Sequence, residues 1–288
     1  RKPRGASFPE FLLPHSPSAA PFLAHIARCH NITLPGAYRP FFCGMTGIGW
    51  VHPGHFESLT AFGCARDTGF GVDRGADIHL LGEKMAEAGL YRSHAELFDV
   101  ITPEGAVIGR IDRGALPILG LAAQGVHMNG LVRKPDGLHL WMGHRARNKR
   151  LDPGKLDHLV AGGVCAGLTP RDALAKEAAE EAAIPPALIA QARPVSHLRY
   201  TMERPEGLRR DLLHCFDLYL PEAFTPVPVD GEVERFELVP IATAFALVRD
   251  TERLKFNVNL VLIDLFLRLG MVPDEDASAL RQALDAVS

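Results

Sequence analysis

The pattern of hydrophobic and polar positions divides the first third of the chain into short helices and strands. Apolar residues at helical spacing predict helices over residues 20–29 and 78–88. A hairpin is expected over residues 100–111, turning at Pro103, Glu104 and Gly105, and residues 41–51 have strand character interrupted by glycines. These elements indicate a small α+β accessory domain, which we place at residues 1–118.

From residue 119 onward the pattern changes to longer strands. Two strands, 126–134 and 138–144, are joined by the strong turn Pro135-Asp136-Gly137, and a further strand at 156–161 ends at Gly162-Gly163. More strands are predicted at 194–202, 212–220 and 234–239. A long helix is predicted at 257–269, followed by a polar tail. Strands flanked by two main helices predict a second α+β domain, an α/β/α sandwich, over residues 119–288.

Composition narrows the class of protein. Hydrophobic residues make up 47% of the 288 and charged residues 23%, enough for a sizeable core. The net charge of −3 argues against a nucleic-acid partner, and the absence of a long apolar run argues against a membrane. Five scattered cysteines without a C-x-x-C pair, and no signal-peptide pattern, lead us to expect a cytoplasmic protein.

The best-specified element is an alanine-rich helix after the glycine pair. Thr169 suits the N-cap, Pro170 suits the first helical position, and Asp172 completes a variant of the capping box. Pro185-Pro186 ends the helix after about four turns.

Three glutamates of this helix are candidate metal ligands. Glu177, Glu180 and Glu181 stand at i, i+3 and i+4, so their carboxylates share one side of the helix, and the first and last of them border its apolar face. Clustered carboxylates repel one another unless a cation joins them, and such oxygen ligands suit Mg²⁺ or Mn²⁺ bound to phosphates. The alternative is a solvated helix face; the preceding glycine pair and loop favour the functional interpretation.

This segment resembles the Nudix box, G-x5-E-x7-R-E-U-x-E-E-x-G-U, where U is aliphatic. Gly162 takes the first position, Lys176-Glu177 the Arg-Glu pair, Ala178 the aliphatic site, Glu180-Glu181 the second acidic pair and Ile184 the last site. The chain departs from the pattern at Leu168, which replaces the early Glu, and at Ala183, which replaces the late Gly.

The resemblance implies a magnesium-dependent hydrolase of a small organic diphosphate. It makes Glu177, Glu180 and Glu181 catalytic carboxylates and metal ligands, with Mg²⁺ or Mn²⁺ as cofactor. It also implies that Gly163 adds a backbone carbonyl to the metal and that Lys176 orients Glu177.

Other site residues are weaker candidates. Glu232 and Glu234 are candidate catalytic bases, against the alternative of solvated loop charges. Arg145 and Lys149 are candidates for binding a terminal phosphate, against exposed loop positions, and Tyr200 for a substrate wall, against the core.

A second resemblance narrows the substrate. Residues 153–163, together with Leu254-Lys255-Phe256-Asn257, Ile263-Asp264 and Arg268-Leu269-Gly270, are similar to the Nudix region of fungal thiamine pyrophosphokinases and to plant plastid Nudix proteins. That subgroup carries an added N-terminal domain. The resemblance implies hydrolysis of thiamine diphosphate or its oxidised analogues to the monophosphate.

Two alternatives stay open. One is a Nudix hydrolase of nucleotide sugars or dinucleotides, and the other is a non-catalytic Nudix-fold binding module. Homodimerisation, common in the family, is a further expectation.

Overall fold

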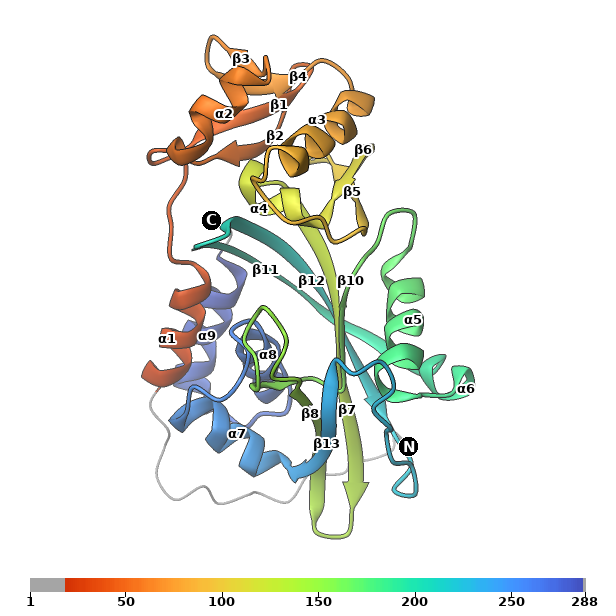
Figure 1. Cartoon of the computed structure of the whole chain (residues 1–288). Coiled ribbons are helices and arrows are strands. Elements are labelled where there is room, and N and C mark those ends of the chain that lie inside the picture. The colour runs from red at the N-terminus through yellow and green to blue at the C-terminus, as the bar shows by residue number, and fades with distance from the viewer. Residues whose placement is uncertain (1–18, 287–288) are drawn as a thin grey trace, which may run out of the picture.

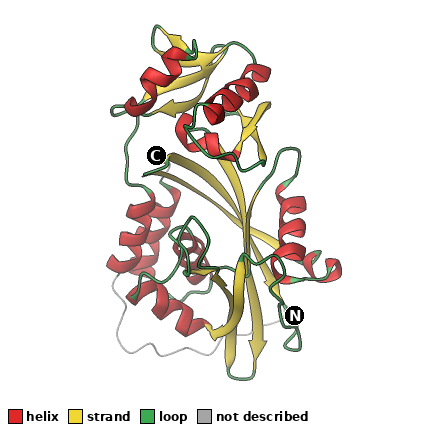
Figure 2. Ribbon diagram, in the orientation of Figure 1, coloured by secondary structure: helices red, strands yellow, loops and turns green. Residues whose placement is uncertain are grey.

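The computed structural model describes residues 19–286, which form one large mixed sheet with helices on both faces and a smaller sheet beside it (Figures 1 and 2). The helices are α1 (Ala20–Cys29), α2 (Phe56–Ala61), α3 (Gly75–Glu87), α4 (Leu116–Leu119), α5 (Pro170–Ala182), α6 (Pro186–Ile189), α7 (Ile241–Asp250), α8 (Val258–Arg268) and α9 (Asp274–Asp285). The strands are β1 (Arg39–Cys43), β2 (Thr46–Val51), β3 (Ala65–Arg66), β4 (Gly69–Val72), β5 (Leu97–Ile101), β6 (Val107–Asp112), β7 (Ala122–Lys134), β8 (Gly137–Arg145), β9 (Leu156–Asp157), β10 (Val160–Gly163), β11 (Arg193–Arg204), β12 (Gly207–Tyr219) and β13 (Val233–Pro240).

The large sheet has the strand order β11-β12-β7-β8-β13, with β10 added to β7 and β9 added to β8. Strands β7 and β12 run parallel, and the other pairs are antiparallel. Helices α5 and α6 lie on one side of the sheet, and α1, α7, α8 and α9 on the other (Figure 1). The predicted α+β fold with an α/β/α sandwich is confirmed.

The alternation along β7 explains the two layers. Val126 and Met128 belong to the core under α5, while Leu131 belongs to the core under α8. Since successive side chains of a strand point to opposite faces, the polar His127 and Asn129 share the α8 side with Leu131.

The N-terminal part has its own sheet and core. Its sheet has the order β2-β1-β4-β3, and β5 and β6 form the predicted hairpin. Phe41, Ile78, Phe98 and Ile111 are among the buried residues that hold these strands to α3. A separate, smaller N-terminal sheet domain is therefore present, as expected.

Helix α1 has the predicted bounds but packs away from that small core. Phe22 is 1% exposed, and its ring centroid lies 5.1 Å from that of Phe245 in α7. Ile26 and Cys29 join the same core under α8. The proposed boundary near residue 118 stays a prediction, and residues 1–18 of the first predicted domain lie outside the described part.

Two predictions about elements need correction. The strand expected at 156–161 is two short strands, since β9 pairs with β8 and β10 pairs with β7 across a break at His158 and Leu159. The polar end expected after the long helix contains α9, whose Leu280 and Leu284 are buried against the core of α1 and α8. Its single apolar stripe on a charged helix is easily missed in the sequence.

Within residues 19–286, none of the helices combines the length and the apolar character needed to cross a membrane.

Candidate active site

Helix α5 begins with the predicted capping box. Thr169 Oγ1 accepts a hydrogen bond from the Asp172 N–H at 3.2 Å, and the Asp172 carboxylate accepts one from the Thr169 N–H at 3.3 Å. Ala173, Leu174, Ala178 and Ala182 face the sheet. This packing fixes the rotation of the helix and so decides where each glutamate points.

Glu181 is the most deeply buried of the three glutamates, with 6% of its surface exposed. Its Oε2 accepts a hydrogen bond from the Ala161 N–H of β10 at 3.0 Å. Carboxylate oxygens of Glu181, Asp230 and Glu232 lie within 4.8 Å of one another. Burial raises the pKa of Glu181 well above its usual value, and repulsion from Asp157, Glu177 and Glu232 raises it further.

Glu177 and Glu180 share a different partner, Lys176. Its Nζ donates to Glu180 Oε2 at 2.8 Å and to Glu177 Oε1 at 3.3 Å. The hydrogen bond to Glu180 is the main cause of the raised pKa of Lys176, and burial raises the pKa of Glu177. Glu180 is exposed, while Glu177 is half-buried. The α5 glutamates therefore divide between the buried Glu181, which lies beside Asp230 and Glu232, and the two glutamates that share Lys176.

The two glycines of β10 allow close approaches on both sides. A Cβ on Gly162 would lie 2.3 Å from the Glu177 side chain, and one on Gly163 would lie 2.5 Å from the Phe98 ring. Gly162 therefore lets α5 bring Glu177 against the strand. The metal-binding carbonyl expected from Gly163 stays a prediction.

A small cavity beside Glu181 is lined by charged and polar residues, among them Arg145, Asp157, His158 and Glu232. Arg145 Nη1 donates to Asp157 Oδ2 at 2.7 Å, and Lys255 Nζ lies 3.3 Å from the same oxygen. Burial opposes ionisation of Asp157, but Lys255 and Arg145 together hold its pKa below the usual value. The cationic side chains of Arg145 and Lys255 therefore compensate the negative charge of Asp157 beside the cavity.

Of the other predicted site residues, Lys149 and Arg145 lie beside the carboxylate group, and both already have partners. Lys149 forms an ion pair with Glu232 at the edge of the carboxylate group. Arg145 lines the cavity, but its guanidinium already binds Asp157 and the carbonyls of Leu151 and Asp152.

Glu234 and Tyr200 lie outside this group of contacts. Glu234 Oε1 accepts from the Arg147 N–H at 3.2 Å, in an exposed position. Tyr200 is 2% exposed in the core of α1 and α8, and its hydroxyl donates to Asp211. The buried ring leaves no surface for a substrate, so we do not retain Tyr200 as a substrate contact.

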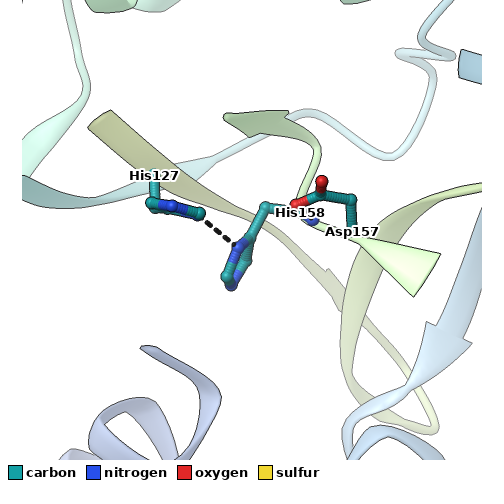
Figure 3. A group of neighbouring side chains, drawn as sticks. All are labelled: His127, Asp157 and His158. Carbon is teal, nitrogen blue, oxygen red and sulfur yellow. Dashed lines mark hydrogen bonds between the residues drawn. The ribbon is translucent and has the colours of Figure 1, made fainter. Parts of the chain in front are cut away.

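Figure 3 shows a second group of possible metal ligands, His127, Asp157 and His158, whose ligand atoms lie within 4.8 Å of one another. His127 Nδ1 lies 3.0 Å from His158 Nδ1. A cation here would meet the positive charges of Arg145 and Lys255 on the same aspartate, at close range and away from water. We therefore interpret this group as a buried polar network.

The carboxylate group around Glu181 fits a divalent cation better. Its donors are all carboxylate oxygens, the ligands that Mg²⁺ and Mn²⁺ prefer. Burial and repulsion from neighbouring carboxylates raise the pKa of Glu181, and a bound cation would offset both because it favours the charged form. Asp230 was not singled out from the sequence, because a loop acid carries no local pattern that distinguishes it from solvated charges.

Comparison with known proteins finds a matching family model and similar proteins. The NUDIX domain family model matches residues 124–257. The chain is 39% identical to Nudix hydrolase 20, chloroplastic, of Arabidopsis thaliana, over 90% of this chain and 75% of that protein. It is 32% identical to Nudix hydrolase 24, chloroplastic, of the same plant, over 92% of this chain and 77% of that protein. Among solved structures it is similar to DR0079 from Deinococcus radiodurans, with 22% identity, coverage of 58% of this chain and 97% of that one, and a TM-score of 0.46.

These relatives correct one expectation. Both Arabidopsis proteins are chloroplastic, so the predicted cytoplasmic location is wrong. The inference rested on scattered cysteines and on the lack of a targeting pattern, and neither feature distinguishes one reducing compartment from another.

Proposed function

The chain belongs to the Nudix hydrolase family, whose substrates are diphosphates, and we propose that it hydrolyses its substrate with Mg²⁺ or Mn²⁺ at the carboxylates of α5. The observation that carries this proposal is the buried carboxylate of Glu181, which has Asp230 and Glu232 within 4.8 Å. A carboxylate so enclosed among like charges is costly unless a cation compensates it.

Glu181 and Asp230 would hold the cation, with Glu177 and Glu180 on the same side of α5 and the Gly163 carbonyl as further ligands. When bound, it would neutralise phosphate charge and lower the pKa of a bound water. Lys176 supports this arrangement because it binds both Glu177 and Glu180.

Glu232 is our proposal for the catalytic base. It lies in the group with Glu181, and its ion pair with Lys149 orients its side chain. Glu234, the other candidate, instead accepts a backbone N–H from Arg147, which supports a structural role for it. A base must reach the proton that it removes, and only Glu232 of the two lies beside the buried carboxylate.

For the substrate we propose thiamine diphosphate or an oxidised analogue, converted to the monophosphate. Two of the segments that carry the thiamine-related resemblance, 153–163 and 254–257, lie side by side, since the N–H of Lys255 donates to the Leu156 carbonyl at 3.0 Å. Asp157 and Lys255, one from each segment, form an ion pair beside the cavity. The net charge of −3 supports a small-molecule partner over nucleic acid, and homodimerisation stays a prediction that light scattering would test.

The test is phosphate release with Mg²⁺ from thiamine diphosphate, its oxidised analogues, nucleotide sugars and dinucleotides. We expect selective conversion of a thiamine diphosphate to the monophosphate. We expect Glu181→Gln to lower kcat by about 100-fold or more, because it removes a ligand charge at the metal.

Glu222→Gln, an exposed glutamate after β12, is the matched control and should retain full activity. Cleavage of a nucleotide sugar or dinucleotide would keep the chemistry and replace the substrate. A folded Glu181→Gln protein with wild-type activity would contradict the site.

A further inference from the structure

The N-terminal domain contacts the loop that leads from β10 into α5. In Figure 1 the hairpin of β5 and β6 stands beside the upper end of this loop. The N–H of Gly167 donates to Asp99 Oδ2 at 2.7 Å, and the N–H of Ala166 donates to the Leu97 carbonyl at 2.8 Å. Cys165 Sγ donates to Glu96 Oε1 at 3.0 Å. Three consecutive residues of the loop are thus bound by one short stretch of another domain.

An apolar contact continues this interface at the end of β10. The Phe98 ring is 3% exposed and packs so closely on Gly163 that a Cβ there would lie 2.5 Å from it. Since Phe98 also belongs to the core of the N-terminal domain, the position of that core and the position of the glycine pair are coupled.

The polar groups on the N-terminal side are themselves held in place. Arg110 Nε donates to Asp99 Oδ1 at 3.1 Å, and Arg113 Nη1 donates to Glu96 Oε2 at 2.9 Å. Each carboxylate therefore uses one oxygen within its own domain and the other on the loop. This geometry fixes a side chain more firmly than a single exposed hydrogen bond does.

The loop needs such support because of its composition. Gly167 has a φ of +80°, a conformation that glycine adopts freely and that its own chain does little to maintain. On one side the loop continues into Gly163, our proposed carbonyl ligand, and on the other into Thr169, the N-cap of α5. A shift of the loop would move both.

We propose that Asp99 of the N-terminal domain is a positioning residue for the hydrolysis, and that it acts by holding the loop 164–169 against β5. The proposal rests on the proposed function of the α5 carboxylates and assigns the N-terminal domain a direct part in it. Asp99 itself does not touch the reacting atoms; it sets the relative position of Gly163 and α5.

Two substitutions separate positioning from folding. Asp99→Ala removes the acceptor for the Gly167 N–H. Asp99→Asn keeps an acceptor oxygen at that place while removing the charge that binds Arg110. Asp67→Ala, an exposed aspartate between β3 and β4 in the same domain, is the matched control.

We expect Asp99→Ala to lower kcat by about 10- to 100-fold, because displacements of about 1 Å at a catalytic group cost rates of that order. The Mg²⁺ concentration for half-maximal rate should rise, while KM for the substrate should change by less than about threefold. Asp99→Asn should recover most of the rate, and Asp67→Ala should match wild type. Circular dichroism and thermal melting would show that each variant is folded.

Mn²⁺ binding, measured by calorimetry without substrate, gives a second readout and should weaken in Asp99→Ala. An active wild type beside an Asp99→Ala protein with unchanged kcat and unchanged Mn²⁺ affinity would overturn the positioning role alone. A wild type that binds no Mn²⁺ and cleaves no diphosphate would overturn the proposed function, and this inference with it.

Discussion

Glu181 shows at the scale of one residue how burial creates a site that requires a proton or a cation. Its side chain is only 6% exposed and lies near the carboxylates of Asp230 and Glu232. Against this burial and repulsion, it accepts a hydrogen bond from the Ala161 N–H. A buried carboxylate with so little compensation is expected to attract a proton or a metal ion. The same residue in an exposed helix would carry no such information.

His158 is a second residue whose environment has a measurable consequence. Burial lowers its pKa from 6.5 to about 4, although Asp157 opposes the shift. The folded protein therefore keeps this ring neutral at pH values where the unfolded chain protonates it. Burial also lowers the pKa of the neighbouring His127, so both act in the same direction.

We predict that the contribution of His158 to stability is lost as the pH falls from about 6.5 to about 4, because at this ring the unfolded state then binds more protons than the folded state. Above pH 6.5, His158 alone should contribute about 3 kcal/mol to the free energy of unfolding. This contribution should be lost as the pH falls to about 4. Urea denaturation across this range is the measurement. The slope should flatten in His158→Asn and persist in His79→Gln, a partly exposed control. Equal slopes in all three proteins would refute the prediction.

At the scale of elements, α5 is specified almost entirely by its own residues. Its capping box, its alanine-rich interior and its apolar face all lie within residues 169–184. Its C-terminal end is the exception. Ala183 has a φ of 52° and a ψ of 36°, the left-handed conformation, which glycine adopts at less cost than alanine.

We predict that Ala183→Gly raises the free energy of unfolding by about 1 kcal/mol, since it removes the strain of a Cβ in that conformation. Ala179→Gly, on the exposed face of the same helix, is the matched control and should lower the free energy by about 1 kcal/mol. Thermal or urea denaturation would measure both. Destabilisation by both glycines would contradict the assigned backbone strain.

At the scale of the whole molecule, the order of elements in space departs from their order in the chain. Helix α1 precedes the small N-terminal sheet but packs in the core of α7, α8 and α9. The hairpin of β5 and β6, together with Glu96 just before it, contacts the loop before α5, which follows much later in the chain. The two domains are therefore linked by packing as well as by the chain.

We predict that Phe22→Ala destabilises the large domain by about 3–5 kcal/mol, because it opens a cavity against Phe245 in a core that lies far along the chain. The two tryptophans allow a direct test, since Trp50 lies in β2 and Trp141 in β8. In a Trp50→Phe background, the fluorescence of Trp141 reports the large sheet.

The Trp141 transition should move to lower urea in Phe22→Ala and stay in place in Leu80→Ala, which is exposed on α3. An unmoved transition in Phe22→Ala would mean that α1 contributes nothing to that core.

The sequence by itself determined what depends on neighbouring residues: the bounds of α1, the hairpin of β5 and β6, the cap of α5 and the spacing of its glutamates. Helix periodicity, turn residues and capping act within a few positions, so a single sequence carries them. Segments 153–163 and 254–257 could be recognised by their resemblance to plant plastid Nudix proteins, but the ion pair of Asp157 and Lys255 between them could not be read from either segment alone.

Only the tertiary structure decided which side chains meet. It brought Asp230 and Glu232 to Glu181, set Asp99 against Gly167, and buried Tyr200 away from the site. Each of these outcomes depends on contacts between segments far apart in the chain, which the packing of both faces of the sheet fixes. A loop carboxylate or a strand tyrosine has the same local sequence whether it is exposed, buried or beside a catalytic helix, and burial and charge pairing supply the difference.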